Sequence, residues 1–153
     1  MKAYVNDLDL ETIEVIDYNG QKQEYSVQEI LHVDETNYQQ EFLKQPSIYA
    51  FWATVLEKGK LVTKQQEDIL NQVHAKCYNR YYKQFLDSGT KPTKDMVEAQ
   101  ILNDEDYSKQ LSVLNNTKYA TERVQYLVKA LEQRAQMLIS YGADQRKEKD
   151  YGN

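Results

Sequence analysis

The residues best suited to binding chemistry lie in one segment, residues 76–83, which reads KCYNRYYK. Three cations are interspersed there with three tyrosines. Single-stranded nucleic acid is bound by this combination, because cations follow the phosphates and aromatic rings stack on the bases. The candidate DNA-binding residues are Lys76, Tyr78, Arg80, Tyr82 and Lys83.

The spacing of the cations supports this interpretation. Lys76, Arg80 and Lys83 are separated by four and three residues, which places them on one side of a helix. Residues 76–94 contain five basic side chains and one acidic side chain, a local charge of +4. The alternative is a solvated basic surface, with Tyr81 and Phe85 in the core and Tyr78 or Tyr82 at its margin.

No sequence pattern indicates catalysis. A Gly-rich phosphate loop, a GxSxG turn and a Cys-x-x-Cys pair are all missing, so we expect no enzyme activity and no cofactor. His32 and His74 lack second ligands at metal-binding spacing, so no metal site is predicted. Cys77 lies on an apolar line and is expected to be a buried, unreactive thiol. Asp104 and Asp106 are interpreted as residues that begin a helix.

Length and composition favour an elongated helical protein. The chain has 153 residues, enough for one domain or for a domain with an appendage. Leu, Ile, Val and Phe make up 35 of them, about 23%, which gives a monomer only a thin core. We therefore expect a homo-oligomer that completes its core between subunits.

The net charge of −5 is unevenly distributed. Residues 1–41 contain ten acids and two lysines, a charge of −8, whereas the remaining 112 residues carry +3. We therefore divide the chain into an acidic N-terminal segment (1–41), a helical domain for DNA binding and oligomerisation (42–147) and a frayed tail (148–153). The acidic segment is suited to docking on a basic partner.

A short hairpin is predicted within the acidic segment. Residues 12–18 alternate loosely and meet Asn19-Gly20, a common two-residue hairpin turn, and residues 21–25 return as a second strand. A frayed helix or an irregular segment is the alternative. Ser26, with Glu29 three residues later, predicts the start of a short helix.

Two long helices follow, and the fold class is mainly α. Apolar residues recur every three or four positions from Ser47 to Ser88, with Gly59 as the weak point of that helix. Thr93 is expected to cap a short helix over residues 94–102. The last helix has an apolar stripe that runs from Val113 through Arg134 to Tyr141, and Gly142 is expected to end it. The two long helices are expected to pair antiparallel.

The sequence also bears on localisation. No apolar run approaches the roughly 18 residues of a membrane span, and the first residues lack the pattern of a signal peptide. We therefore expect a cytoplasmic protein with no membrane contact.

The order of segments resembles the phage UvsY-like recombination mediators over about residues 44–147. The resemblance rests on residues 44–52 (KQPSIYAFW), 85–89 (FLDSG), 91–93 (KPT), 101–107 (ILNDEDY) and 134–143 (RAQMLISYGA). In that family the DNA-binding cations lie on the long helix after the tryptophan. Ala75-Lys76 matches that motif, whereas Arg80 and Lys83 are shifted from it. The acidic N-terminal hairpin is not part of the family pattern.

The resemblance implies a non-enzymatic accessory factor of homologous recombination. Such mediators bind single-stranded DNA and help a RecA-type recombinase to load where single-strand-binding protein already sits. They are ring-like homo-oligomers of helical subunits, and a phage-encoded one acts in the host cytoplasm. DNA recombination, repair and replication are the processes that this implies.

Two other functions remain open at this point. A helical adaptor or inhibitor would act by protein–protein contact through the acidic residues 1–41. A structural coiled-coil subunit of a larger assembly would also fit the long helices.

Overall fold

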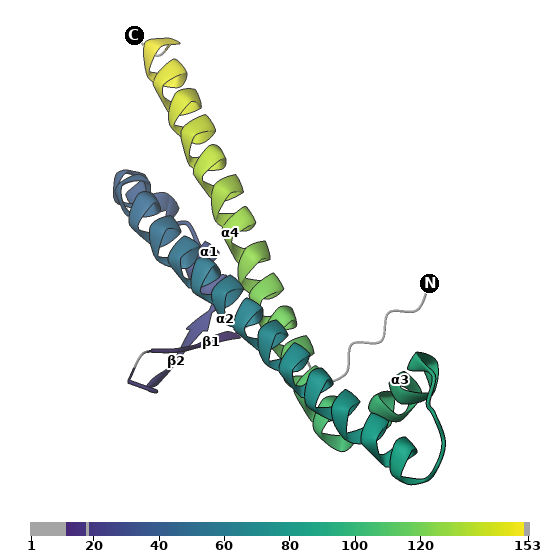
Figure 1. Ribbon diagram of the computed structural model, residues 1–153. Coiled ribbons are helices and arrows are strands. Elements are labelled where there is room, and N and C mark those ends of the chain that lie inside the picture. Colours follow the sequence, from purple (N-terminus) through teal and green to yellow (C-terminus); the bar gives the residue numbers. More distant parts are fainter. Residues whose placement is uncertain (1–11, 18, 152–153) are drawn as a thin grey trace. The chain divides into compact units, whose positions relative to one another are not determined.

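The computed structural model describes residues 12–17 and 19–151 (Figure 1). Tyr18, which we assigned to the first strand, lies outside these residues, as do residues 1–11 and 152–153. The elements in chain order are β1 (Thr12–Ile16), β2 (Lys22–Ser26), α1 (Val27–Leu31), the 3-10 turn η1 (Glu35–Asn37), α2 (Tyr38–Asp87), α3 (Lys94–Leu102) and α4 (Glu105–Tyr151). The predicted mainly α fold with a small N-terminal hairpin is confirmed.

The hairpin turn forms at Asn19-Gly20, where the sequence predicted it. Gly20 has a positive φ of 77°, and Oδ1 of Asp17 accepts hydrogen bonds from the backbone N–H groups of Asn19 (2.8 Å) and Gln21 (2.9 Å). The strands pair antiparallel, with Ile13 opposite Tyr25. The structure therefore has the predicted hairpin and not the frayed helix that was the alternative.

Helix α2 begins nine residues before the expected start at Ser47, and Pro46 lies inside it. Proline removes a helical hydrogen bond and disfavours helical geometry in the residue before it, which is why the pattern predicted a break. That preceding residue, Gln45, is buried and donates from Nε2 to the carbonyl oxygen of Leu131 (2.8 Å). A contact with a residue distant in the sequence thus stabilises the helix at Pro46, its weakest position.

The predicted boundaries of the short helices are confirmed. Ser26 Oγ accepts from the N–H of Glu29 (3.3 Å) at the start of α1, and Thr93 Oγ1 accepts from the N–H of Met96 (3.3 Å) at the start of α3. The turn before α3 contains Gly89 with a φ of 81°. Side-chain oxygens at these positions satisfy N–H groups that have no partner within the helix.

The expected end of the last helix at Gly142 is wrong, because α4 continues to Tyr151. A Cβ at Gly142 would lie 2.6 Å from the hydroxyl oxygen of Tyr38. The ring of Tyr38 also packs on Tyr141, with centroids 5.0 Å apart. Glycine at 142 therefore makes room for a tyrosine, and the polar residues after it continue the helix to Tyr151.

The chain forms two compact units, and α2 and α4 contribute to both. The terminal unit comprises Met1–Leu56 and Val124–Asn153, and the middle unit is Glu57–Arg123. The core of the terminal unit is built around Trp52, Leu127 and Leu131, which the hairpin joins through Ile13. The core of the middle unit consists of Cys77, Val97 and Ile101, with partly buried aromatic rings around them.

Within each unit the two long helices run antiparallel, as expected. In the middle unit Thr63 Oγ1 lies 3.1 Å from Thr121 Oγ1, and Glu67, later in α2, pairs with Lys118, earlier in α4, at 3.0 Å. The predicted stripe on α4 is only partly buried. Its central residues from Val124 to Leu138 form the core, whereas Val113 and Tyr141 are more than 40% exposed.

Candidate nucleic-acid interface

The five candidate DNA-binding residues all lie on α2 within the middle unit. Three are exposed cations and two are half-buried tyrosines: Lys76, Arg80, Lys83, Tyr78 and Tyr82. A helix turns about 100° per residue, so the tyrosines lie about 100–160° around the helix from Lys76 and Lys83. An exposed strip that contains Asn79 therefore runs along the helix, with the lysines on one side of it and the tyrosines on the other.

The tyrosines belong to a row of stacked rings. The rings of Tyr78 and Tyr82 are 6.2 Å apart and inclined by 15°, and His74 stacks on Tyr78 at 6.4 Å and 30°. Both tyrosines also pack against the core of the middle unit. Since each shared face is already occupied by a neighbouring ring, a nucleic-acid base would stack on an outer face of this row.

Arg80 is held by carboxylates. Its Nη2 forms an ion pair with Oδ2 of Asp104, and its Nη1 lies 3.8 Å from Oδ2 of Asp106. The guanidinium also lies over the ring of Tyr81, 5.2 Å from the centroid. The structure thus separates Arg80 from the two lysines, because its charge is already paired within the protein.

Asp104 is a buried carboxylate that accepts hydrogen bonds from α2 and from the start of α4. Tyr81 donates its hydroxyl at 2.6 Å, Cys77 its thiol at 3.4 Å, and the backbone N–H groups of Asp106 and Tyr107 donate at 3.0 and 3.1 Å. The hydrogen bonds from Tyr81 and Tyr107 hold the pKa of Asp104 well below its ordinary value of 3.8. This confirms that Asp104 begins a helix and adds a link to α2 that the sequence did not predict.

The same contacts raise the pKa of two other groups. The hydrogen bond to Asp104 raises the pKa of Tyr81, and burial raises the pKa of the Cys77 thiol. Cys77 is only 2% exposed. Since the thiolate is the reactive form, the predicted buried, unreactive thiol agrees with this environment.

The lysines, in contrast, are available. Within residues 12–17 and 19–151, no ion pair involves Lys76, Lys83, Lys91 or Lys94, and all four side chains are exposed. The ion pairs of the middle unit instead use Arg80 and other lysines, such as Lys118. The unpaired cations of the candidate segment are therefore its lysines.

His74 lies beside a carboxylate of the middle unit. His74 Nε2 lies 2.8 Å from Glu98 Oε2 in the middle unit, with both side chains about one-third exposed. Among the described residues, no group of three or more His, Cys, Asp and Glu side chains is arranged to hold a metal ion.

The helices within residues 12–17 and 19–151 also bear on membrane spanning. None of these helices combines the length and the apolar character that a membrane crossing requires.

A second polar cluster lies in the terminal unit around Arg134, which is 5% exposed. Its guanidinium contacts the carboxylate of Glu41 and Oε1 of Gln45, and it donates to the carbonyl oxygen of His32 at 3.0 Å. Its Nε is buried and has no hydrogen-bond partner among the described residues. Arg134 occupies a position in the apolar stripe of α4, and a cation at such a position was the signal for this cluster.

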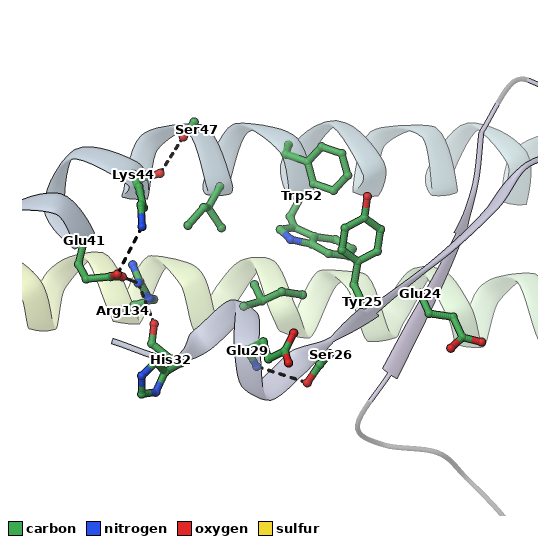
Figure 2. Close-up of a pocket in the computed structure, with 13 residues that line it drawn as sticks. Glu24, Tyr25, Ser26, Glu29, His32, Glu41, Lys44, Ser47, Trp52 and Arg134 are labelled. Carbon is green, nitrogen blue, oxygen red and sulfur yellow. Dashed lines mark hydrogen bonds and ion pairs between the residues drawn. The ribbon is translucent and has the colours of Figure 1, made fainter. Parts of the chain in front are cut away.

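A pocket of about 560 Å³ adjoins this cluster, within the terminal unit. Residues of β2, α1 and α2 line it, together with Arg134. Figure 2 shows Glu24 at one end, Arg134 with its partners at the other, and Tyr25 and Trp52 between them. Sequence reasoning missed this pocket, because its lining comes from segments far apart in the chain.

Comparisons with known proteins do not identify a relative. No family model matches the chain, and searches of curated proteins and of solved structures find no match. The function therefore has to be argued from the two sites themselves.

Proposed function

We propose that the chain binds single-stranded DNA through the exposed side of α2 in the middle unit and acts as a non-enzymatic recombination mediator. The supporting observation is the presence of unpaired, exposed Lys76 and Lys83 on the same helix as the stacked rings of Tyr78 and Tyr82. The lysines would contact phosphates and the outer ring faces would stack on bases. Arg80 would contribute less, because Asp104 already neutralises its charge.

A mediator of this kind would assist a RecA-type recombinase in replacing single-strand-binding protein. The middle unit has eleven basic and ten acidic residues, so its overall field is weak and binding depends on the local arrangement of lysines. One such site per subunit gives modest affinity. Several sites in one ring-shaped homo-oligomer would raise the avidity without new contacts.

Exposed apolar side chains support self-association of the subunits. On α4 in the terminal unit, Tyr126 is 69% exposed and Met137 is 70% exposed. The two residues are eleven positions apart, which is about three helical turns, so their side chains share one side of the helix. Mass measurement by analytical ultracentrifugation should show an oligomer that is weakened by Tyr126→Ser with Met137→Ser. The matched variant Gln125→Ser with Gln136→Ser should leave the mass unchanged.

DNA binding is tested by fluorescence anisotropy with a labelled oligothymidylate of about 20 nucleotides, at several salt concentrations. Lys76→Ala with Lys83→Ala should reduce affinity about tenfold at low salt and lower the salt slope by about 0.7 per lost phosphate contact. Lys58→Ala with Lys147→Ala removes the same charge from exposed positions outside the segment and should have little effect. Equal binding by both double variants would contradict the proposed site.

The stacking part of the proposal has its own test. Tyr82→Leu keeps a half-buried apolar side chain against the core but removes the aromatic face, and it should weaken binding about threefold to tenfold at any salt concentration. Tyr119→Leu, at an exposed position outside the segment, serves as the control. A Tyr82→Leu variant that binds like the wild type would exclude base stacking at this ring.

A further inference from the structure

The pocket of the terminal unit has an acidic and aromatic end that the DNA proposal does not use. Glu24 and Glu29 both line it, both are exposed, and neither forms an ion pair with any described residue. Figure 2 shows Glu24 on β2 at the end of the pocket away from Arg134, and Glu29 on α1 between that end and Arg134. Two unpaired carboxylates beside a pocket favour a cationic ligand group.

Aromatic rings lie beside these carboxylates. Tyr25 packs edge-on against Trp52, with centroids 5.2 Å apart, and lies 5.7 Å from Phe51. Trp52 is buried at 2% exposure, whereas Phe51 is 43% exposed. An ammonium or guanidinium group is attracted to such ring faces, and the attraction increases when the cation is partly removed from water.

At the opposite end of the pocket, two cations share one carboxylate. The charge of Arg134 is paired with Glu41, which also lies 3.9 Å from Lys44. Further acceptors, the side chain of Gln45 and the carbonyl oxygen of His32, fill other positions of the guanidinium. The lining as a whole has three carboxylates against two cations, a formal charge of −1, and the carboxylates without an ion pair to any described residue are those of Glu24 and Glu29.

The pocket also runs along the edge of a strand. Three consecutive residues, Glu24, Tyr25 and Ser26, line it. Alternate side chains of a strand point to opposite faces, so a pocket bordered by three in succession lies at the strand's edge. β1 pairs with one edge of β2, and among the described residues no strand pairs with the other. An open edge of this kind is a site for addition of a further strand.

We propose that this pocket binds an extended basic segment of a partner protein. The segment would add to the free edge of β2 and place a Lys or Arg side chain between Glu24 and Glu29, against the rings of Tyr25 and Phe51. The backbone pairing would supply affinity, and the acidic and aromatic end would select the cationic side chain. This inference is independent of DNA binding by the middle unit.

The probe is a labelled, capped peptide of alternating Lys and Val, measured by anisotropy and by the fluorescence of Trp52, the only tryptophan of the chain. The peptide should bind and shift the Trp52 emission, whereas a Glu-Val peptide should do neither. Glu24→Gln with Glu29→Gln should weaken binding about tenfold or more, since two charge-assisted contacts are lost. Glu35→Gln with Glu148→Gln removes the same charge from exposed positions outside the pocket and should bind like the wild type.

Equal weakening by both pairs of substitutions would overturn the proposal, because it would show attraction to net charge alone. Peptide binding without any change in Trp52 emission would also overturn it. The Glu24→Gln with Glu29→Gln variant should keep its affinity for the oligothymidylate. This measurement distinguishes a failure of the proposed peptide site from a failure of the proposed DNA site.

Strand addition is tested with peptides N-methylated at every second backbone amide, in either of two registers. Only one edge of a bound peptide faces β2, so one register should lose binding and the other should keep it. Equal affinities in the two registers would overturn strand addition. Phe51→Leu, which keeps an apolar side chain at the pocket, should weaken the Lys-Val peptide about threefold through loss of the cation–ring contact. An unchanged affinity would exclude that contact.

Discussion

The two units each hold an ion pair, but the more deeply buried member is the anion in the middle unit and the cation in the terminal unit. In the middle unit the side chain of Asp104 is 6% exposed and that of Arg80 is 46% exposed. In the terminal unit the side chain of Arg134 is 5% exposed and that of Glu41 is 12% exposed. The buried anion is satisfied by donors at a helix start, whereas the buried cation needs acceptors from several distant segments. The first arrangement fixes a helix boundary, and the second joins elements together.

The largest effect is expected from Arg134→Met. It leaves Glu41 and Gln45 without their buried partner, and the free energy of unfolding in urea should fall by about 3–5 kcal/mol. Lys129→Met, at an exposed position of the same helix, is the control. Arg134→Met with Glu41→Leu should recover part of the loss, because no unpaired charge remains. A loss below about 1 kcal/mol for Arg134→Met would contradict a joining role.

Asp104→Ala should have a smaller effect, because the half-exposed Arg80 can be solvated by water once its partner is lost. The start of α4 loses its side-chain acceptor and Tyr81 loses its hydrogen-bond partner, so we expect Tm to fall by roughly 5–8 °C in thermal unfolding followed by circular dichroism. Asp106→Ala removes the exposed neighbour as a control. If Asp106→Ala lowered Tm as much as Asp104→Ala, the buried carboxylate would not be the element that fixes this boundary.

The pH dependence of stability should report on the ion pair of the middle unit. The pKa of Asp104 is lowered by folding, so its contribution is complete above its ordinary value of 3.8 and is lost as pH falls toward the lower folded value. Between about pH 5 and pH 3, the wild type should lose more stability than Asp104→Asn, measured by urea unfolding at each pH. Parallel losses in the two proteins would show that Asp104 does not titrate in this way.

The smallest effect is expected at the contact between Gly142 and Tyr38 in the terminal unit. Gly142→Ala gains helix propensity but brings a methyl group to 2.6 Å from the Tyr38 hydroxyl oxygen, so the net change in unfolding free energy should be near zero. Combined with Tyr38→Phe, which removes that oxygen, the same substitution should add about 0.5 kcal/mol relative to Tyr38→Phe alone. A full gain from Gly142→Ala in the wild-type background would show that the close approach has no cost.

Local signals in the sequence predicted much of this fold. Asn19-Gly20, Ser26 and Thr93 each act within a few residues, and the structure has a turn or a helix start at every one of them. The failures are at Pro46 and Gly142, where a neighbour from a distant segment overrides the local preference. A pattern that covers only nearby residues does not include the buried contacts of Gln45 or the ring of Tyr38.

The candidate site could be predicted in its residue types but not in its pairing. The exposure of Lys76 and Lys83 follows from helical spacing, and so does the partial burial of Tyr78. The pairing of Arg80 with Asp104 does not follow from helical spacing, because the two residues are 24 positions and two turns apart in the chain. Arg134 stands in the apolar stripe of the last helix, but we did not predict a buried ion pair from it.

The buried positions of Trp52 and Cys77 have a consequence for how the chain unfolds. They are the only tryptophan and the only cysteine of the sequence, and they lie in the separate cores of the terminal and middle units. Emission from Trp52 therefore reports the opening of one core, and the rate at which a thiol reagent modifies Cys77 reports the opening of the other. The unaltered protein can thus reveal whether its two cores open in one cooperative step or in two.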